Sequence, residues 1–415
     1  MKKNSEHFDV IVIGGGAAGM MAAGRAGERG RKVLLFEKNK TLGKKLAITG
    51  GGRCNITNAE YNVRLLLKNY GAGEKPLYSP FSQFGVEETF AFFEGRKLPL
   101  VVQERGRVFP RSEKAPDVVR VMENYCSENG VVIQTNTAVT NIVLHKEKTA
   151  EIITHHCTYL AEAVIVASGG VSHPETGSTG DGFAWLKACG HTIAKPTPGI
   201  VPLAVRDRWV KNLSGVTLEP MKITFFLNNK KQFSRAGKIL FTHFGLSGPM
   251  ILNCASAVGD LLHEGEVTAT IDACPLEDEG ALERRIIRIF DENKNKTLKN
   301  IFKLIAPPGM SQEISSLIDG VFKETKVHSV TKVQRKKIIQ TLKALPVTIT
   351  DLMGYDRAVV ADGGVDIKEI DMKTMRSRLH HNLFIIGDLL HIARPSGGYS
   401  LQLCWTTGYI AGSNA

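Results

Sequence analysis

A glycine-rich turn near the start of the chain constrains its fold more than any other feature. Residues 10–13 form a short apolar run typical of a strand buried on both faces, and Gly14, Gly16 and Gly19 follow it as G-x-G-x-x-G. The first glycine permits a tight turn, the second lets the backbone approach a pyrophosphate, and the third lets a helix pack against the strand. The free N–H groups at the start of that helix attract a phosphate.

A carboxylate stands where such a domain needs one. Residues 33–36 are a second apolar run, and Glu37 follows it directly. A carboxylate at this position accepts hydrogen bonds from both ribose hydroxyls of an adenosine, and it disfavours a 2′-phosphate. Strand, glycine turn, helix and acid together predict a dinucleotide-binding α/β domain. These residues suit NAD as well as FAD, so the choice depends on the rest of the chain.

The polar run at 43–58 favours FAD. It contains three consecutive glycines at 50–52, which indicates backbone lying close to a flat or phosphorylated group. The run comes just after the ribose-binding acid, where FAD enzymes of the glutathione-reductase type thread the chain past the ribityl group and the flavin. NAD-dependent dehydrogenases have no need of such a segment.

Later segments repeat the combination of buried strand and glycine turn. Residues 163–167 predict a strand, 168–170 turn sharply after it, and 177–182 open a further helix. Near the end, 382–388 predict a buried strand that finishes in Gly-Asp. Residues 397–402 then begin a last helix, whose N-terminus is expected to face the pyrimidine end of the flavin.

Four motifs carry a family resemblance that runs nearly from end to end. They are Gly50-Gly-Gly-Arg-Cys-Asn55, Gly177-Ser-Thr-Gly-Asp-Gly182, Phe241-Thr-His-Phe-Gly-Leu-Ser-Gly-Pro249 and Gly397-Gly-Tyr399. On these motifs the chain resembles the BaiN/YhiN-like FAD-binding flavoproteins, also labelled NAD(FAD)-utilising dehydrogenases. The resemblance implies an α/β, FAD-binding Rossmann-like domain of the glutathione-reductase/fumarate-reductase type, with an inserted β-barrel-like and helical domain.

The fingerprint and the resemblance together predict which residues contact FAD. They are Gly14, Gly16, Ala17, Ala18, Gly19, Glu37, Lys38, Lys44, Thr49, Gly51, Gly52, Arg53, Cys54, Asn55, Ser168, Gly169, Gly170, Thr179, Asp181, Gly387, Asp388, Gly397, Gly398, Tyr399 and Ser400. Covalent attachment in the fumarate reductase relatives needs a histidine after the ribose-binding acid, and residues 42–58 contain none. FAD is therefore expected to bind non-covalently.

The chain departs from the family pattern at three places beside the expected flavin pocket. The usual Gly-Glu is Gly387-Asp388, which keeps a carboxylate. The segment usually rich in Asp and Gly is His391-Ile-Ala-Arg394, and the usual Asn after Gly-Gly-Tyr is Ser400. Substrate identity therefore carries over from the family less safely than FAD binding does.

Three residues are candidates for handling a proton or substrate. Cys54 and Tyr399 stand beside glycine turns, and His243 is a polar residue within an apolar turn segment. Each also has a structural interpretation: a small packing residue, a stacking platform and a hydrogen-bonded turn histidine. A second G-x-G-x-x-G is absent, so NAD(P)H is expected to bind only transiently, near the flavin and against the insert.

The nucleotide-binding domain is expected to be discontinuous. Residues 1–194 supply its first part, 358–415 complete it, and 195–357 form an insert marked by prolines at its start. Short alternating runs predict a β part over about 195–275 and 345–357. Helical spacing predicts a three-helix part over about 276–344, with helices near 282–290, 311–323 and 331–344.

Composition limits the partners and the compartment. The seven cysteines are scattered without a Cys-x-x-Cys pair, so neither a disulfide framework nor a metal site is expected. The longest apolar runs fall far short of the roughly 20 residues that span a bilayer, which predicts a cytoplasmic protein without a membrane partner. The net charge is +12, and residues 200–345 carry 22 basic against 15 acidic side chains, a net of +7. That excess is either a solvated surface or a site for a polyanion such as RNA.

The resemblance implies a reductase of an activated C=C bond that uses hydride from NAD(P)H. Family members are linked to reducing conjugated enones of steroid type and to making dihydrouridine in 23S ribosomal RNA. The basic insert favours ribosomal RNA, while the alternative substrate is a small conjugated carbonyl compound. A flavin-binding redox sensor without turnover is the alternative from a different class.

Overall fold

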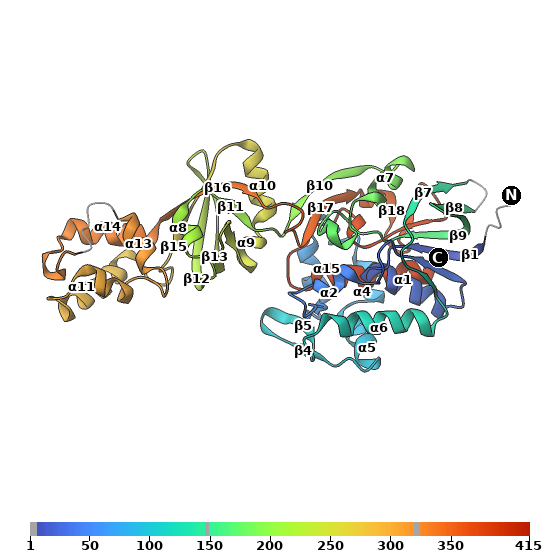
Figure 1. Cartoon of the computed structure of the whole chain (residues 1–415), viewed down its shortest axis with the longest axis horizontal. Helices are drawn as coiled ribbons and strands as arrows, with labels where there is room; N and C mark the ends of the chain where they lie inside the picture. The colour runs from blue at the N-terminus through green and yellow to red at the C-terminus, as the bar shows by residue number, and fades with distance from the viewer. Residues whose placement is uncertain (1–5, 146–148, 319–323) are drawn as a thin grey trace. The chain divides into compact units, whose positions relative to one another are not determined.

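The computed structural model describes residues 6–145, 149–318 and 324–415. The chain forms two compact units, Met1–Thr197 with Ala358–Ala415, and Pro198–Arg357 (Figure 1). We call them the Rossmann unit and the insert. The insert predicted over 195–357 thus begins within a few residues of the second unit.

A twisted sheet of parallel strands forms the centre of the Rossmann unit. Its order is β18-β19-β20-β9-β1-β2-β6, and β8 pairs with β9 and β7 beside this path. The run β20-β9-β1-β2-β6 is parallel, while β18, β19, β7 and β8 pair antiparallel. The strands are β1 His7–Ile13, β2 Val33–Phe36, β6 Val132–Gln134, β7 Val139–Leu144, β8 Ala150–Thr154, β9 Thr158–Val166, β18 Ile370–Asp371, β19 Arg376–Ser377 and β20 Leu383–Ile385.

The strands predicted from apolar runs are all present. Residues 33–36 coincide with β2, and the runs at 10–13, 163–167 and 382–388 lie within or across β1, β9 and β20. Val10, Ile11 and Val12 are fully buried. Strands covered on both faces are expected to show such continuous apolar runs, which explains why the sequence predicted them well.

Helices and two small sheets cover this core. The helices are α1 Ala17–Glu28, α2 Lys44–Ile48, α3 Val63–Leu67, α4 Tyr78–Gln83, α5 Val86–Gly95, α6 Ala115–Glu128, α7 Asp181–Ala188 and α15 Tyr399–Asn414. The small sheets are β3 Thr57–Asn58, β5 Arg107–Pro110 and β4 Leu100–Val102 in that order, and β10 Ile193–Gly199 with β17 Val360–Val365.

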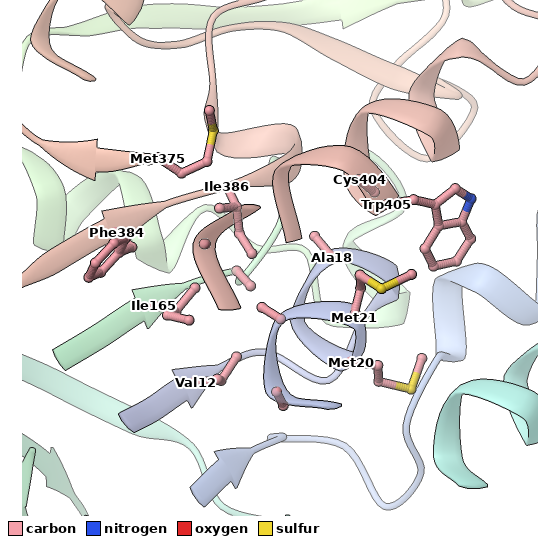
Figure 2. Packing of buried hydrophobic residues seen from close by; sticks show 14 of the residues in the cluster. Val12, Ala18, Met20, Met21, Ile165, Met375, Phe384, Ile386, Cys404 and Trp405 are labelled. Carbon is pink, nitrogen blue, oxygen red and sulfur yellow. The ribbon is translucent and has the colours of Figure 1, made fainter. Parts of the chain in front are cut away.

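Helix α1 lies between the parallel strands and the C-terminal helix α15. Figure 2 shows Val12 and Ile165 of the sheet, Ala18 and Met21 of α1, and Trp405 of α15 around one apolar centre. The two helices approach closely because small residues face each other. A Cβ at Gly408 would lie 2.5 Å from the Ala18 carbonyl oxygen, so a larger residue there has no space.

The insert contains a closed six-stranded barrel. Its order is β11-β14-β13-β12-β15-β16. The strands are β11 Leu203–Val205, β12 Thr217–Leu227, β13 Lys230–Phe241, β14 Gly245–Ser247, β15 Val267–Asp272 and β16 Leu345–Leu352. Ile223, Phe225, Phe241 and Ile271 alternate toward its interior and are fully buried. The barrel-like part of the insert was therefore predicted correctly.

The helical part differs in detail from the three predicted helices. Between 276 and 344 the described residues form α11 Glu279–Glu292, α12 Leu298–Ile301, α13 Ser311–Leu317 and α14 Lys332–Lys343. Helix α12 was missed because four residues are too few to show a period. The helix predicted over 311–323 ends at Leu317 among the described residues, and 319–323 lie outside them. Three more helices complete the insert, namely α8 Arg208–Asn212, α9 Pro249–Leu252 and α10 Ala255–Glu264.

Within residues 6–145, 149–318 and 324–415, we find no helix with the length and apolar character needed to span a membrane.

Candidate cofactor site

The three fingerprint glycines have the geometry that a dinucleotide turn requires. Gly14 has φ +109°, and a Cβ on it would lie 2.5 Å from the carbonyl oxygen of Ala167 in the neighbouring chain segment. A Cβ on Gly19 would overlap the Gly14 carbonyl oxygen, so α1 packs directly on the turn. Gly16 has no atom within 4 Å of a Cβ position, which leaves its backbone open to a ligand.

Glu37 lies at the carboxyl end of β2 with its carboxylate held in place. One carboxylate oxygen accepts a hydrogen bond from the Gly15 amide at 2.9 Å, and the other accepts two from Asn39 at 2.7 Å. The side chain is only 8% exposed, yet it lines a cavity. Three of its roughly four acceptor sites are occupied, which leaves one site, on the oxygen bound by Gly15, for a ribose hydroxyl.

That cavity lies at the carboxyl ends of the parallel strands, where ligands bind in open α/β sheets. Its predicted lining residues are Gly14, Gly16, Ala17, Ala18, Glu37, Lys38, Lys44, Thr49, Ser168, Gly169, Asp181, Gly387 and Asp388. The Ser168 hydroxyl is buried without a hydrogen-bond partner among the described residues. An orphaned hydroxyl in the wall of a cavity indicates a missing ligand, since an unsatisfied buried polar group costs about 1–3 kcal/mol.

Asp388 is half-buried between two cations. Its carboxylate lies 3.6 Å from Lys45 Nζ and accepts a hydrogen bond from the Arg394 guanidinium. Burial by itself raises the pKa of Asp388, but the charges of Arg394 and Lys45 outweigh burial and hold the pKa below that of a free aspartate. The carboxylate is therefore ionised at neutral pH and available as an acceptor in the cavity wall.

The three departures from the family pattern contact one another. The Arg394 side chain is 1% exposed; its Nε donates to Ser400 Oγ at 2.8 Å and one terminal nitrogen donates to the Ile392 carbonyl at 2.6 Å. Since another nitrogen holds Asp388, the segment 391–394 and the start of α15 are locked to the cavity wall. No pattern in the sequence indicated this contact. Arg394 and Ser400 belong to two different motifs, and neither motif indicates a partner in the other.

Lys38 and Asp181, both predicted contacts, pair with each other. Lys38 Nζ lies 2.8 Å from the Asp181 carboxylate and 2.6 Å from Thr179 Oγ1. Thr179 also donates to Asp181 at 2.9 Å. Burial raises the pKa of Asp181, but the bonds from Lys38 and Thr179 outweigh it and leave the pKa lowered. The cluster closes one side of the cavity with its charges neutralised.

The glycines at 50–52 are exposed or half-buried, with φ between +62° and +83°, and the space beside Gly51 and Gly52 is open. Arg53 does not line the cavity; it lies over the Phe109 ring and 3.3 Å from Glu113. These contacts indicate that Arg53 forms a structural ion pair rather than a contact in the cofactor cavity. Asn55 accepts a hydrogen bond from the Val108 amide.

Cys54 lies in the hydrophobic core of the Rossmann unit. Its side chain is completely buried, and burial raises the pKa of its thiol. A thiol without access to a substrate does not transfer a proton to it, so the structure offers no support for Cys54 as the acid. The chemistry of the residue type suggested the role, and only the tertiary packing reveals the burial.

Tyr399 begins α15 at a sharply turned backbone. Gly398 has φ +102°, and a Cβ on it would overlap the Thr57 backbone, so only glycine brings α15 this close to β3. Tyr399 is half-buried, and its carbonyl accepts a hydrogen bond from the Tyr70 hydroxyl at 2.9 Å. Burial raises the pKa of the Tyr399 phenol, which keeps its proton at neutral pH.

The remaining predicted contacts lie outside the lining of this cavity. They are Gly19, Gly51, Gly52, Cys54, Asn55, Gly170, Thr179, Gly397, Gly398, Tyr399, Ser400 and Arg53. His243 belongs to the insert, where it is exposed and its ring meets Phe244 edge-on. The structure thus brings together the ribose, pyrophosphate and Asp388 positions, and Cys54 and Tyr399 lie outside the lining of their cavity.

Lys45 and Cys404 line the cavity and were not predicted. Lys45 belongs to the polar run after the fingerprint and directly follows Lys44, so the sequence could have predicted it as a further contact. Cys404 lies on a helix that is buried on nearly all faces, and burial raises the pKa of its thiol to about 12. Nothing in the sequence distinguishes it from a core residue.

The fold and the site together define an FAD-binding oxidoreductase built on a Rossmann-type domain. The residues present fit that cofactor, because Glu37, the open Gly16 and the orphaned Ser168 hydroxyl lie along one cavity. The family described as HI0933-like protein Rossmann domain matches residues 8–414, and the chain belongs to it.

Curated relatives match the chain over almost its whole length. A 3-dehydro-bile acid delta(4,6)-reductase from Clostridium scindens is 29% identical over 410 residues, covering 97% of this chain and 98% of the relative. A ribosomal RNA dihydrouridine synthase from Haemophilus influenzae is 27% identical over 410 residues, covering 98% of each.

Solved structures share the fold at much lower identity. A 3-ketosteroid-delta4-(5alpha)-dehydrogenase from Rhodococcus jostii superposes with a TM-score of 0.54 and 13% identity, covering 100% of this chain and 98% of the other. A flavocytochrome c3 fumarate reductase superposes with a TM-score of 0.54 and 16% identity, covering 99% and 78%. Both likenesses concern the fold alone.

Proposed function

We propose that this protein is an NAD(P)H-linked reductase that adds hydride to a C=C bond conjugated with a carbonyl group. The observation that carries the proposal is the end-to-end match to two relatives whose names describe different substrates and one bond chemistry. A 4,6-unsaturated bile acid ketone and a uracil ring both present a carbon conjugated with a carbonyl. The shared element is the flavin-dependent step, and the substrate is what differs.

The residues of the Rossmann unit have distinct tasks in this proposal. Bound FAD supplies a carrier that takes hydride from a reduced nicotinamide and delivers it to carbon. Glu37 binds the ribose, and the turn at Gly14–Gly16 with the start of α1 receives the pyrophosphate. Ser168 and Asp388 provide hydrogen-bonding groups in the same cavity wall. Tyr399, protonated at neutral pH, is the candidate for returning a proton to the substrate.

A ribosomal RNA substrate is favoured by the surface of the insert. Exposed cations lie on α11 and α14 and at the β12–β13 turn, at Arg284, Arg288, Lys332, Lys336, Lys337, Lys230 and Lys231. Lys332 is the first residue of α14, where positive charge opposes the helix dipole and costs about 0.3–1 kcal/mol. A lysine kept at a position that lowers helix stability supports a role in binding phosphates. A small enone offers no use for these charges.

Two further arginines on α11 and α14 are engaged in ion pairs. Arg285 lies 3.0 Å from the Glu277 carboxylate and Arg335 lies 3.5 Å from that of Glu283. The second pair joins α14 to α11, while Glu277 lies in the turn before α11. The phosphate-binding set is therefore proposed without Arg285 and Arg335.

The decisive experiment is anaerobic. The purified protein should be yellow, release FAD on denaturation, and lose its flavin absorbance when NADH or NADPH is added. Reoxidation should then follow addition of either ribosomal RNA or a 4-en-3-one steroid, and the product should be dihydrouridine or the saturated ketone. A flavin that stays oxidised with both NADH and NADPH would instead support the redox sensor without turnover.

A further inference from the structure

The Rossmann unit has a second cavity, separate from the cofactor site. Its volume is about 720 Å³, within the range that holds a drug-sized or nucleotide ligand. Three chain segments form it: 72–79 around the start of α4, 366–378 around β18 and β19, and 391–393 before α15. No lining residue is shared with the cofactor cavity, and neither the sequence motifs nor the proposed reaction uses this site.

Positive charge dominates the lining. Lys75, Lys368, Lys373 and Arg378 are exposed around the cavity, against the carboxylates of Asp366 and Asp371. Among the described residues, none of the three lysines makes an ion pair within 4.0 Å. An anion is the ligand that such a rim attracts.

The two carboxylates are already engaged by their own turns. Asp366 accepts a hydrogen bond from the Lys368 amide at 3.0 Å. Asp371 accepts bonds from the Lys373 amide at 3.2 Å and the Thr374 hydroxyl at 2.9 Å. Both carboxylates are therefore engaged by backbone and hydroxyl donors, and among the described residues neither forms an ion pair with the lysines of the cavity.

Arg378 is prepared for a phosphate. Its Nε donates to the Ile370 carbonyl at 3.2 Å, which holds the guanidinium against β18. The two terminal nitrogens remain for a ligand, and their planar fork matches two phosphate oxygens. A guanidinium anchored in this way loses less conformational entropy on binding than a free lysine does.

The cavity also offers surface for a planar ring. Tyr78 is 49% exposed at the rim, and the buried side chains of Ile370 and Met372 contribute an apolar floor. An aromatic face stacks a nucleobase or a nicotinamide without regard to its identity. Cations, a fixed guanidinium and an exposed ring together describe a ligand that carries both phosphate and a flat heterocycle.

The second cavity lies next to the cofactor cavity along the chain. His391 and Ala393 line it, while Ile392 and Arg394 between and after them bind each other and hold Asp388 in the cofactor cavity wall. One short segment thus places His391 and Ala393 in the lining of the second cavity and binds Asp388 of the cofactor cavity through Arg394. A ligand at His391 and Ala393 contacts the same segment that fixes Asp388.

We propose that this cavity binds a phosphorylated nucleotide. Two kinds of ligand have this chemistry: a nicotinamide dinucleotide and a nucleotide of single-stranded RNA. The inference rests on the proposed function in one respect, because both candidate ligands are reactants of that function.

The test measures binding to the FAD-loaded protein without turnover. Equilibrium binding of NADP⁺, NAD⁺ and a short single-stranded oligouridylate is compared for the wild type and for Lys368→Glu/Lys373→Glu. The matched control is Lys187→Glu/Lys195→Glu, which changes the net charge equally at exposed lysines of the same unit outside the cavity. Arg378→Lys tests the bidentate contact, and flavin content and the unfolding temperature report on folding.

The expected result is at least tenfold weaker binding of one probe by the cavity variant and little change in the control. Arg378→Lys should weaken the same probe, and the affected probe identifies the source. Equal binding by both double variants, or no binding of any probe by the wild type, would overturn the inference. Neither result bears on flavin reduction, so the proposed function can stand when the cavity fails. Conversely, if the cavity binds NADP⁺ and the protein reduces no substrate, the inference about the cavity stands and the proposed function fails.

Discussion

At the scale of single residues, Glu37 is the position whose role depends most directly on its hydrogen bonds. Its carboxylate is oriented by the Gly15 and Asn39 amides and is nearly buried. We expect Glu37→Gln to weaken FAD binding about 10- to 100-fold, since a hydrogen bond to a charged acceptor is worth about 1.5–3 kcal/mol. Titration of the apoprotein with FAD measures the change, and FMN, which has no adenosine, serves as the control ligand. An unchanged FAD affinity would show that the carboxylate does not meet the ribose.

Tyr399 has a half-buried phenol whose pKa is raised by burial. If it returns a proton to the reduced carbon, Tyr399→Phe should lower the rate of substrate reduction about 10²-fold or more. Reduction of the flavin by NAD(P)H should hardly change, because that half-reaction takes no proton from the phenol. Stopped-flow measurement of the two half-reactions separates these effects. Equal slowing of both would point to a packing role against Tyr70.

Asp388 links stability to pH. Its pKa is lowered in the folded protein, so its ion pairs contribute fully above the ordinary aspartate pKa and are lost as the pH falls through the lowered value. The stability difference between wild type and Asp388→Asn should therefore be largest near neutral pH and should shrink on acidification. Urea unfolding at a series of pH values measures it. A difference that grows toward low pH would contradict the buried pairing with Arg394 and Lys45.

At the scale of secondary-structure elements, the contact between α1 and α15 depends on missing side chains. Gly408 and Gly412 lie one turn apart on α15 and face the Ala18 and Ala22 carbonyl oxygens of α1. Gly408→Ala would gain helix propensity, yet its Cβ meets backbone that cannot move aside. We expect a net loss of about 1–3 kcal/mol in the free energy of unfolding. Gly95→Ala, where a Cβ meets no atom within 4 Å, is the control.

The glycine spacing on α15 is visible in the sequence, but it does not predict a close helix contact unless the partner helix is known. The strands of the parallel sheet were easier to predict, because burial on both faces leaves an apolar run that needs no partner to be recognised. Helix α12 and the short strands β18 and β19 have two to four residues each. Elements this short are defined by hydrogen bonds to distant segments, which no local pattern reveals.

At the scale of the whole molecule, the unequal distribution of charge is the property to test. The excess of +7 at residues 200–345 includes exposed lysines of α14. Reversing Lys332, Lys336 and Lys337 to Glu should weaken binding of ribosomal RNA fragments and reduce its salt dependence, because fewer counterions are released. Flavin content should stay constant, since these residues belong to the insert.

A matched triple reversal at Lys40, Lys187 and Lys195 of the Rossmann unit gives the same net charge at other exposed positions. Filter binding at several salt concentrations compares the two variants. If both lose RNA equally, the effect belongs to net charge and not to α14. If the wild type binds no RNA, a small conjugated carbonyl compound becomes the substrate to pursue.

The sequence by itself determined the nucleotide-binding core. Gly14, Gly16, Gly19 and Glu37 act through backbone conformation and through the ends of adjacent strands, and both properties follow from spacing along the chain. The β part of the insert followed equally from alternating apolar residues, and the family resemblance implied that it is barrel-like. Local rules were sufficient wherever the interacting groups are close in the sequence or each strand carries its own pattern.

Only the tertiary structure decided which polar residues reach the site. It buried Cys54, paired Arg53 with Glu113, and joined Arg394 to Asp388 and Ser400. The physical reason is that burial and charge pairing depend on segments brought together by folding. A cysteine or an arginine has the same letter whether it faces a substrate, a neighbouring carboxylate or the core.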